Sequence, residues 1–146
     1  MTTREFEAKD RKALSTLYLE TRRQCFDWLD VNSLQQSDFD RDTAGEKIWV
    51  CEVDGKLVGF ISVDESDNFI HHLFILPQFS RLGYAAQLLQ TCLNNIGRPA
   101  RLKCVAANIN AFNFYQAKGW HTVSMGLSVD GEYHLMETDR PGFFMG

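Results

Sequence analysis

The chain of 146 residues is long enough for one domain with a hydrophobic core, and its 45% hydrophobic and 23% charged residues are typical of a folded protein. A formal net charge of -4 argues against general nucleic-acid binding, and no apolar run approaches the roughly 20 residues of a membrane span. Four cysteines without CxxC spacing and a polar start without signal-peptide character indicate a cytoplasmic protein with reduced thiols. The histidines lack metal-ligand spacing, so no metal is expected.

The first 43 residues favour one strand followed by helical segments. Thr3 to Phe6 is expected to form the strand, and Asp10 is a candidate N-cap for a helix that runs to about Arg22. The inner face of this helix, by its 3.6-residue spacing, carries Leu14, Leu17 and Tyr18. The stretch from Cys25 to Thr43 is expected to be irregular to helical.

Three strands should come next. Lys47–Val53 and Lys56–Val63 are apolar runs on either side of Asp54-Gly55, a dipeptide that predicts a type I′ hairpin turn. Phe69–Leu76 is the third strand, and Pro77 ends it because proline cannot donate to a sheet ladder.

The second half alternates helices and strands before a final hairpin. The pattern predicts a helix over Gly83–Asn95, a buried strand over Ala100–Val105, and a helix that Asn108 caps and Gly119 stops. Trp120–Val129 then pairs with Glu132–Thr138 across Asp130-Gly131. This order predicts an α/β sandwich with a mixed, mostly antiparallel sheet of six to seven strands, flanked by about four helices.

Two segments carry features of a ligand site. Residues 69–85, FIHHLFILPQFSRLGYA, form a strand, a proline stop, a loop and a helix start, where free backbone N–H groups suit a phosphate or pyrophosphate. Residues 108–120, NINAFNFYQAKGW, place Asn108, Ala111, Phe112 and Tyr115 on one helical face. Each segment also has a purely structural interpretation, with Gly83 as a helix-start glycine and Tyr115 as a core residue.

Together, the order of elements and these two segments resemble the GNAT superfamily of N-acetyltransferases. The first matches the family's acyl-CoA signature at Gly83 and Ala85, while Ser80 stands where Gln or Arg is usual and Arg81 where glycine is frequent. The second matches Asn-x-x-Ala-x-x-Phe-Tyr-x-x-x-Gly-Phe, with Trp120 in place of the last Phe. The resemblance implies one acyl-CoA N-acyltransferase domain over residues 1–146, with acetyl-CoA as co-substrate and no metal.

The resemblance also assigns cofactor contacts. In this family the strand before the loop diverges from the next parallel strand and its free backbone groups pair with the pantetheine arm. The residues implied in binding acetyl-CoA are Leu73, Phe74, Ile75, Ser80, Arg81, Leu82, Gly83, Tyr84, Ala85, Asn108 and Tyr115. Asn108 is expected to bond the pantetheine, to cap its helix, or to do both.

Three residues are candidates for proton transfer. By resemblance, His71 takes the proton of the acceptor amine, directly or through water, and Tyr115 protonates the departing CoA thiolate. Period-two alternation places His71 with Leu73 and Ile75 and His72 on the opposite face, but a β-bulge would exchange the two histidines. Glu65 is a weaker alternative as the base.

The acceptor side is less defined by the sequence. Phe26 and Trp28 are expected to form an aromatic wall for the substrate, or else an ordinary core contact. A small-molecule amine is the preferred acceptor, with a protein lysine or N-terminus second and a non-catalytic acyl-CoA-binding module as the rival function. No nucleic-acid or membrane partner is expected, and the family's pairing through the last strands makes a homodimer an open option.

Overall fold

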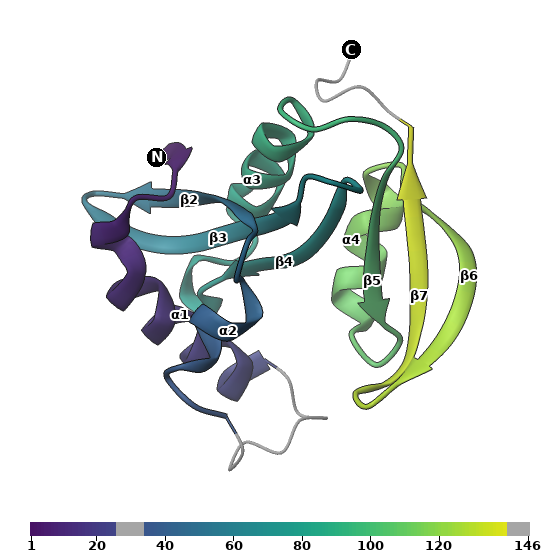
Figure 1. The fold of residues 1–146 in the computed structure, drawn as a ribbon, viewed down its shortest axis with the longest axis horizontal. Helices are drawn as coiled ribbons and strands as arrows, with labels where there is room; N and C mark the ends of the chain where they lie inside the picture. Colours follow the sequence, from purple (N-terminus) through teal and green to yellow (C-terminus); the bar gives the residue numbers. More distant parts are fainter. Residues whose placement is uncertain (26–33, 140–146) are drawn as a thin grey trace.

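A computed structural model describes residues 1–25 and 34–139 of the chain, which form one seven-stranded sheet with helices on both faces (Figure 1). The strands are β1 (Thr2–Glu5), β2 (Lys47–Val53), β3 (Lys56–Asp64), β4 (Phe69–Ile75), β5 (Ala100–Val105), β6 (His121–Ser128) and β7 (Gly131–Thr138). The α-helices are α1 (Arg11–Cys25), α2 (Asp38–Asp42), α3 (Tyr84–Leu93) and α4 (Ile109–Ala117), with short 3-10 turns η1 (Ala8–Asp10) and η3 (Pro77–Phe79). The predicted fold class is confirmed.

The sheet runs in the order β1-β2-β3-β4-β5-β7-β6. Every neighbouring pair is antiparallel except β4 and β5, which are parallel. The parallel register covers only Phe69 with Arg101 and Ile70 with Leu102, after which the strands separate. In Figure 1 the right-hand part of the sheet, from β5 to β6, turns away from β1–β4 at this point.

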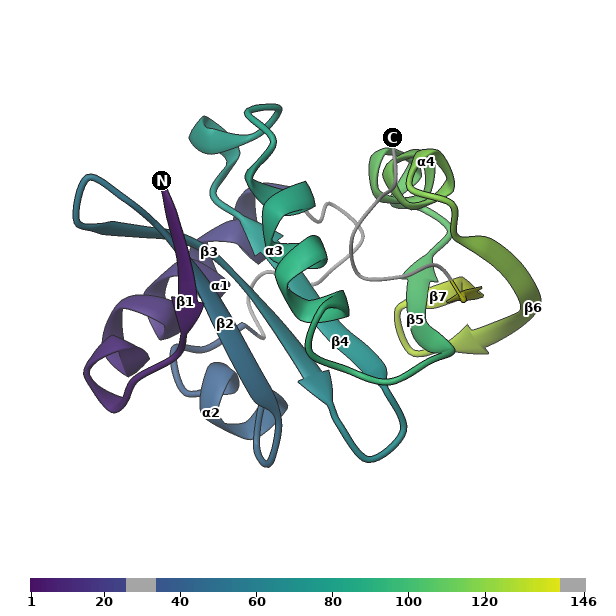
Figure 2. The same cartoon turned by 90° about the horizontal axis from the view of Figure 1, so that it is seen from above.

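Helices cover both faces of the sheet (Figure 2). A cluster of apolar side chains on each face holds them to the strands. Buried residues of α1 and α2 pack with β2 and β3 on one face: Leu14, Leu17, Tyr18, Phe39, Ile48, Val50 and Phe60. On the other face α3 and α4 contribute Leu88, Leu89, Cys92, Leu93 and Tyr115 to a second cluster. The alternation of apolar residues in β2 and β3 thus supplies both faces, as the strand period of two requires.

Some local predictions need correction. Asp10 is not a side-chain cap of α1, because its carboxylate accepts the Glu7 N–H at 2.8 Å and pairs with Arg4 at 2.8 Å. The last hairpin pairs Ser128 with Gly131, so its turn is Val129-Asp130 rather than Asp130-Gly131. The Asp54-Gly55 turn is confirmed as a hairpin turn, since both residues have the positive φ, 51° and 80°, that type I′ demands.

Among the described residues, no helix combines the length and the apolar character needed to cross a membrane. The same ranges, 1–25 and 34–139, contain no group of three or more His, Cys, Asp or Glu side chains placed to hold a metal ion.

Candidate functional site

The separation of β4 from β5 opens a cleft of about 950 Å³ that crosses the sheet. Its walls come from elements far apart in sequence. The lining includes His71–Ile75 of β4, Lys103–Val105 of β5, Asn108, Ala111 and Tyr115 at α4, Tyr18, Arg22, Asp38 and Asp42 of the first helices, and Ser128–Asp130 with Tyr133 at the last hairpin. Several of the residues expected to act on the cofactor and the amine therefore line one cavity.

Within the described residues, the second half of β4 carries backbone groups without a strand partner into this cleft. Leu76 N–H donates to Val58 O at 2.8 Å, which fixes the direction of alternate residues along β4. The backbone N–H and C=O of Phe74 then point to β3, where Phe60 is its partner. The N–H and C=O of Leu73 and Ile75 point the other way, toward the separated β5. Of the three residues expected to pair with the cofactor arm, only Leu73 and Ile75 have backbone groups directed there.

The start of α3 provides a second set of free N–H groups. Gly83 is the N-cap, with a left-handed φ of 85°, and Arg81 also has a positive φ of 63°. The first intrahelical bond runs from Gln87 N to Gly83 O, and in the described part of the chain no acceptor is found for the N–H groups of residues 81–86. Such a helix start attracts anions.

Other residues of the predicted signature contribute less at this helix start. Ser80 uses both its N–H and its hydroxyl on Pro77 O, at 3.1 and 2.8 Å. Leu82 is 59% exposed, and Tyr84 packs its ring against Phe79 with centroids 6.4 Å apart. Ser80 would therefore have to give up its bonds to Pro77 before it could bind an anion. Tyr84 would contact an anion through its backbone N–H and not through its side chain.

The second motif forms α4 as predicted. Asn108 caps the helix, because its Oδ1 accepts the Ala111 N–H at 3.2 Å, and Gly119 follows it with φ 92°. Tyr115 is 8% exposed and lines the cleft, and its hydroxyl makes no hydrogen bond within residues 1–25 and 34–139. Burial raises the pKa of Tyr115 well above that of a free phenol, so this group stays protonated at neutral pH.

A β-bulge decides where the two histidines lie. Ser62 pairs with His72 but Val63 pairs with Ile70, which leaves His71 as the extra residue. Ile70 consequently joins Leu73 in the cluster against α3, and the extra residue His71 falls outside the alternation of that face. The strict period-two expectation for His71 is wrong, since the bulge turns both histidines toward Glu46.

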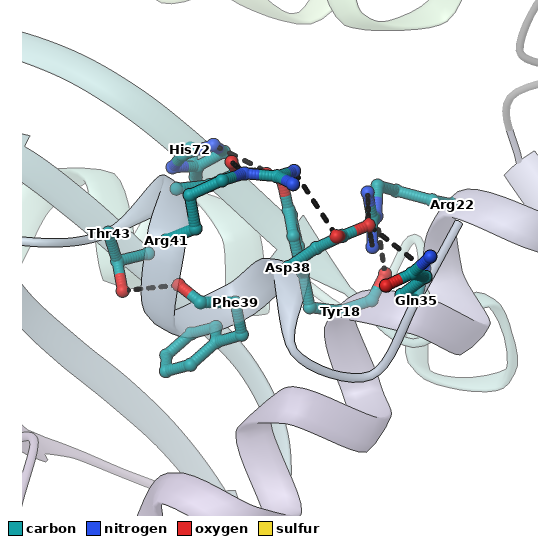
Figure 3. A network of polar contacts seen from close by, with 9 residues as sticks. Tyr18, Arg22, Gln35, Asp38, Phe39, Arg41, Thr43 and His72 are labelled. Atoms are coloured by element: carbon teal, nitrogen blue, oxygen red, sulfur yellow. Dashed lines mark hydrogen bonds and ion pairs between the residues drawn. The ribbon is translucent and has the colours of Figure 1, made fainter. Parts of the chain in front are cut away.

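His72 is enclosed by hydrogen bonds on the α1 side (Figure 3). Its Nδ1 lies 2.8 Å from Ser62 Oγ and its Nε2 3.5 Å from the Tyr18 hydroxyl, which donates to Asp42 at 2.7 Å. One tautomer satisfies all three contacts, with Ser62 donating to Nδ1 and Nε2–H donating to Tyr18. Burial lowers the pKa of His72 to about 4, so the ring is neutral and has no lone pair left for a substrate proton.

This buried neutral ring should make folding pH-dependent. The folded pKa lies below the unfolded value of about 6.5, so the stabilising contribution is present above pH 6.5 and is lost as the pH falls toward 4. From pH 7 to pH 5 the loss is expected to be about 2 kcal/mol of unfolding free energy. Urea unfolding at pH 7 and pH 5 measures this loss. The unfolding free energy of His72→Gln should fall by about 2 kcal/mol less than that of the native protein between these pH values. Equal losses in the two proteins would contradict the prediction.

The network around His72 continues to a buried ion pair that the sequence did not single out. Asp38 accepts hydrogen bonds from both terminal nitrogens of Arg22 at 3.2 Å, and Arg41 forms an ion pair with the same carboxylate at 3.2 Å (Figure 3). The Arg22 guanidinium also lies 3.8 Å from the centre of the Tyr18 ring. These contacts fix the wall of the cleft that α1 and α2 form.

His71 is the more accessible histidine. Its side chain is 40% exposed and lines the cleft, while its Nδ1 contacts Glu46 Oε2. Burial, together with His72 and Lys103, lowers the pKa of His71, so its ring is neutral at pH 7. Glu65, the alternative base, is exposed in the β3–β4 turn and does not line the cleft.

The sequence predicted Phe26 and Trp28 as substrate residues but did not predict Glu46 as part of the site. Phe26 and Trp28 lie outside the described residues. A single Glu after Gly45 is typical of a solvated turn, so the sequence gives no sign of a role for Glu46. Only the tertiary structure buries its side chain against β4.

A family model described as an acetyltransferase (GNAT) domain matches residues 19–137 of the chain. The match covers α2 to β6, the last seven residues of α1 and all but the last residue of β7, and therefore part or all of every element that lines the cleft.

Among curated proteins, the chain is 32% identical over 123 residues to the peptidyl-lysine N-acetyltransferase YiaC of Escherichia coli, covering 82% of this chain and 83% of that protein. Among solved structures, an N-acetyltransferase from Staphylococcus aureus superposes with a TM-score of 0.76 at 16% identity, over 94% of this chain and 100% of that one. Spermidine N-acetyltransferase from Vibrio cholerae, in complex with CoA and spermine, gives a TM-score of 0.69 at 14% identity, over 94% of each chain. The structural matches concern the fold.

Proposed function

The chain belongs to the GNAT family of acetyltransferases, and from this premise we propose that it transfers the acetyl group of acetyl-CoA directly to a primary amine in the β4–β5 cleft. One observation carries the proposal: the unpaired backbone of Leu73 and Ile75 leads through the loop to the uncapped N–H groups at Gly83. A pantetheine arm and a pyrophosphate need those two kinds of partner, in that order.

The residues present fit acetyl-CoA. The N–H groups of residues 81–86 would hold the pyrophosphate, and the Arg81 guanidinium, on an exposed residue, would add a charge-assisted contact. Backbone groups of Leu73 and Ile75 would bond the pantetheine amides. Acetyl-CoA supplies the activated thioester, and the N–H groups of β4 polarise its carbonyl.

His71 acts as the general base in this proposal. An alkyl ammonium must lose a proton before its nitrogen can attack, and a neutral imidazole at the cleft wall accepts that proton. His72 is excluded from the role by its hydrogen bonds to Ser62 and Tyr18. Neither motif contains a cysteine, and burial raises the pKa of Cys104, which lines the cleft, to about 11, so a thiolate nucleophile is disfavoured and the transfer is direct.

Tyr115 stabilises the leaving group. Because burial raises the pKa of its phenol, full proton transfer to a thiolate of pKa about 8.5 is uphill, and the hydroxyl works chiefly as a hydrogen-bond donor to the sulfur. Tyr115→Phe should therefore lower kcat by about 30-fold, the equivalent of one hydrogen bond of about 2 kcal/mol to a charged group, without moving either limb of the pH profile. Steady-state kinetics from pH 6 to 9 checks this, with calorimetry as the control that acetyl-CoA affinity is retained; an unchanged kcat would remove Tyr115 from the mechanism.

For the acceptor we propose a lysine side chain of a polypeptide. The support is the 32% identity to a peptidyl-lysine acetyltransferase and the rim of the cleft, where the fully exposed Val129 and the exposed Arg41 leave room for a chain to cross. A small-molecule amine, preferred from the sequence, is the second candidate.

The test measures CoA release with three acceptors: a peptide with one lysine, the same peptide with arginine in its place, and a polyamine. Turnover that requires the peptide lysine, at least tenfold faster in kcat/KM than the polyamine, supports the proposal. Preference for the polyamine would replace it with the second candidate. No turnover with any amine by a protein that binds acetyl-CoA would favour a non-catalytic binding module.

A further inference from the structure

Glu46 is a buried carboxylate directly behind the two histidines of β4. It precedes β2 and follows Gly45, whose φ is 78°. Its side chain is only 6% exposed. Its Oε2 contacts His71 Nδ1, and its Oε1 lies 3.7 Å from His72 Nδ1.

This carboxylate has no permanent counter-charge in the described part of the chain. Its ion-pair contacts there are with the two histidines, and Oε1 is buried without a hydrogen bond. The adjacent Lys47 pairs instead with Glu5 at 3.0 Å. A buried carboxylate is costly in free energy unless it is paired with a positive charge. Protonation of His71 would supply that charge to Glu46.

The contact also fixes which nitrogen of His71 is free. A carboxylate accepts a hydrogen bond from Nδ1–H, so the proton of the neutral ring stays on Nδ1 and the lone pair on Nε2 is left for a substrate. His71 lines the cleft whereas Glu46 does not. Glu46 therefore does not touch a substrate in the cleft itself, and the cleft residue with a free ring nitrogen that it contacts directly is His71.

We propose that Glu46 is a positioning residue for the acetyl transfer: it holds His71 as the Nδ1–H tautomer and stabilises the imidazolium that forms when Nε2 takes the amine proton. The proton moves from the acceptor nitrogen to Nε2, His71 gains one positive charge, and the negative Glu46 balances it until the proton passes to water. This inference rests on the proposed function and adds the residue that prepares the base.

Other charged groups face the same pair. Lys103 on β5 and His72 oppose a charge on His71, and on the far side of His72 lie Tyr18 and Arg22 of α1 and Asp42 of α2. Asp42 is already engaged by Tyr18 and by Arg41, at 2.7 and 2.9 Å. Among these groups, Glu46 alone offers a carboxylate in contact with the His71 ring.

The experiment is a ¹⁵N NMR titration of the histidine rings in the full chain without substrate. The native protein should show His71 as the Nδ1–H tautomer, and Glu46→Gln should lower its pKa by about one unit. Glu52→Gln is the matched control, because it removes the same charge at the other end of β2, where Glu52 pairs with Arg4 at 3.0 Å. The control should leave the pKa of His71 unchanged, because Glu52 does not contact either histidine.

A kinetic readout accompanies the titration. The acid limb of kcat/KM should move to lower pH in Glu46→Gln by the same amount as the pKa, with a lower plateau because the base is weaker.

Two results would overturn the inference: an Nε2–H tautomer of His71 in the native protein, which needs no variant to fold, or an unchanged His71 pKa in folded Glu46→Gln. Both are read without acetyl-CoA, so they are separable from the proposed function. A protein with the expected tautomer that acetylates no amine would instead overturn the proposed function, and with it the catalytic meaning of the contact.

Discussion

Replacing His71 with alanine should lower kcat/KM for an amine acceptor about 1,000-fold at pH 7, within the range expected for loss of a general base. The native enzyme can bind the abundant ammonium form and remove its proton. The variant must wait for free amine, of which a lysine with pKa near 10.4 offers about 0.04% at pH 7. Its deficit should therefore shrink about tenfold for each pH unit up to pH 9.

The measurement is the initial rate of CoA release by the native protein and by His71→Ala from pH 7 to pH 9. His121→Ala is the matched control, since His121 is an exposed histidine on the edge strand β6. A His71→Ala deficit that stays constant with pH would indicate a role in binding or structure rather than in proton removal.

Replacing Gly83 with glutamate should weaken acetyl-CoA binding by at least about 100-fold, which corresponds to about 2.8 kcal/mol. A side chain at φ 85° costs roughly 1–2 kcal/mol of strain. Nothing lies within 4 Å of the added Cβ, and a carboxylate at a helix start is favourable, so the fold should persist. The same carboxylate then occupies the N–H groups that the pyrophosphate needs and repels its charge.

Calorimetric titration with acetyl-CoA tests this against Gly55→Glu. Gly55 has φ 80° and open space around its Cβ, so that variant carries equal strain and charge in the β2–β3 turn. It should bind acetyl-CoA within about twofold of the native protein, a difference of about 0.4 kcal/mol. Equal affinity of Gly83→Glu and the native protein would place the pyrophosphate elsewhere.

The limits of sequence reasoning are visible in β4. Its existence, its end before Pro77 and the helix that follows Gly83 depend on local backbone preferences, and the structure confirms them. The direction of His71 depends on a bulge, which is a property of the pairing with β3. No periodicity within β4 reveals how its partner strand is aligned.

Local stretches of sequence were enough to predict the order of the helices and strands, the Asn108 cap and the glycine start of α3, because each depends on residues within one or two turns of chain. The tertiary structure alone decided that β4 and β5 separate after two pairs, that His72 is sealed by Tyr18 and Ser62, and that Glu46 lies against His71. Those contacts join groups up to 54 residues apart. These contacts arise from the register between neighbouring strands and from the packing of α1 on the sheet. Neither can be derived from the spacing of residues within one segment.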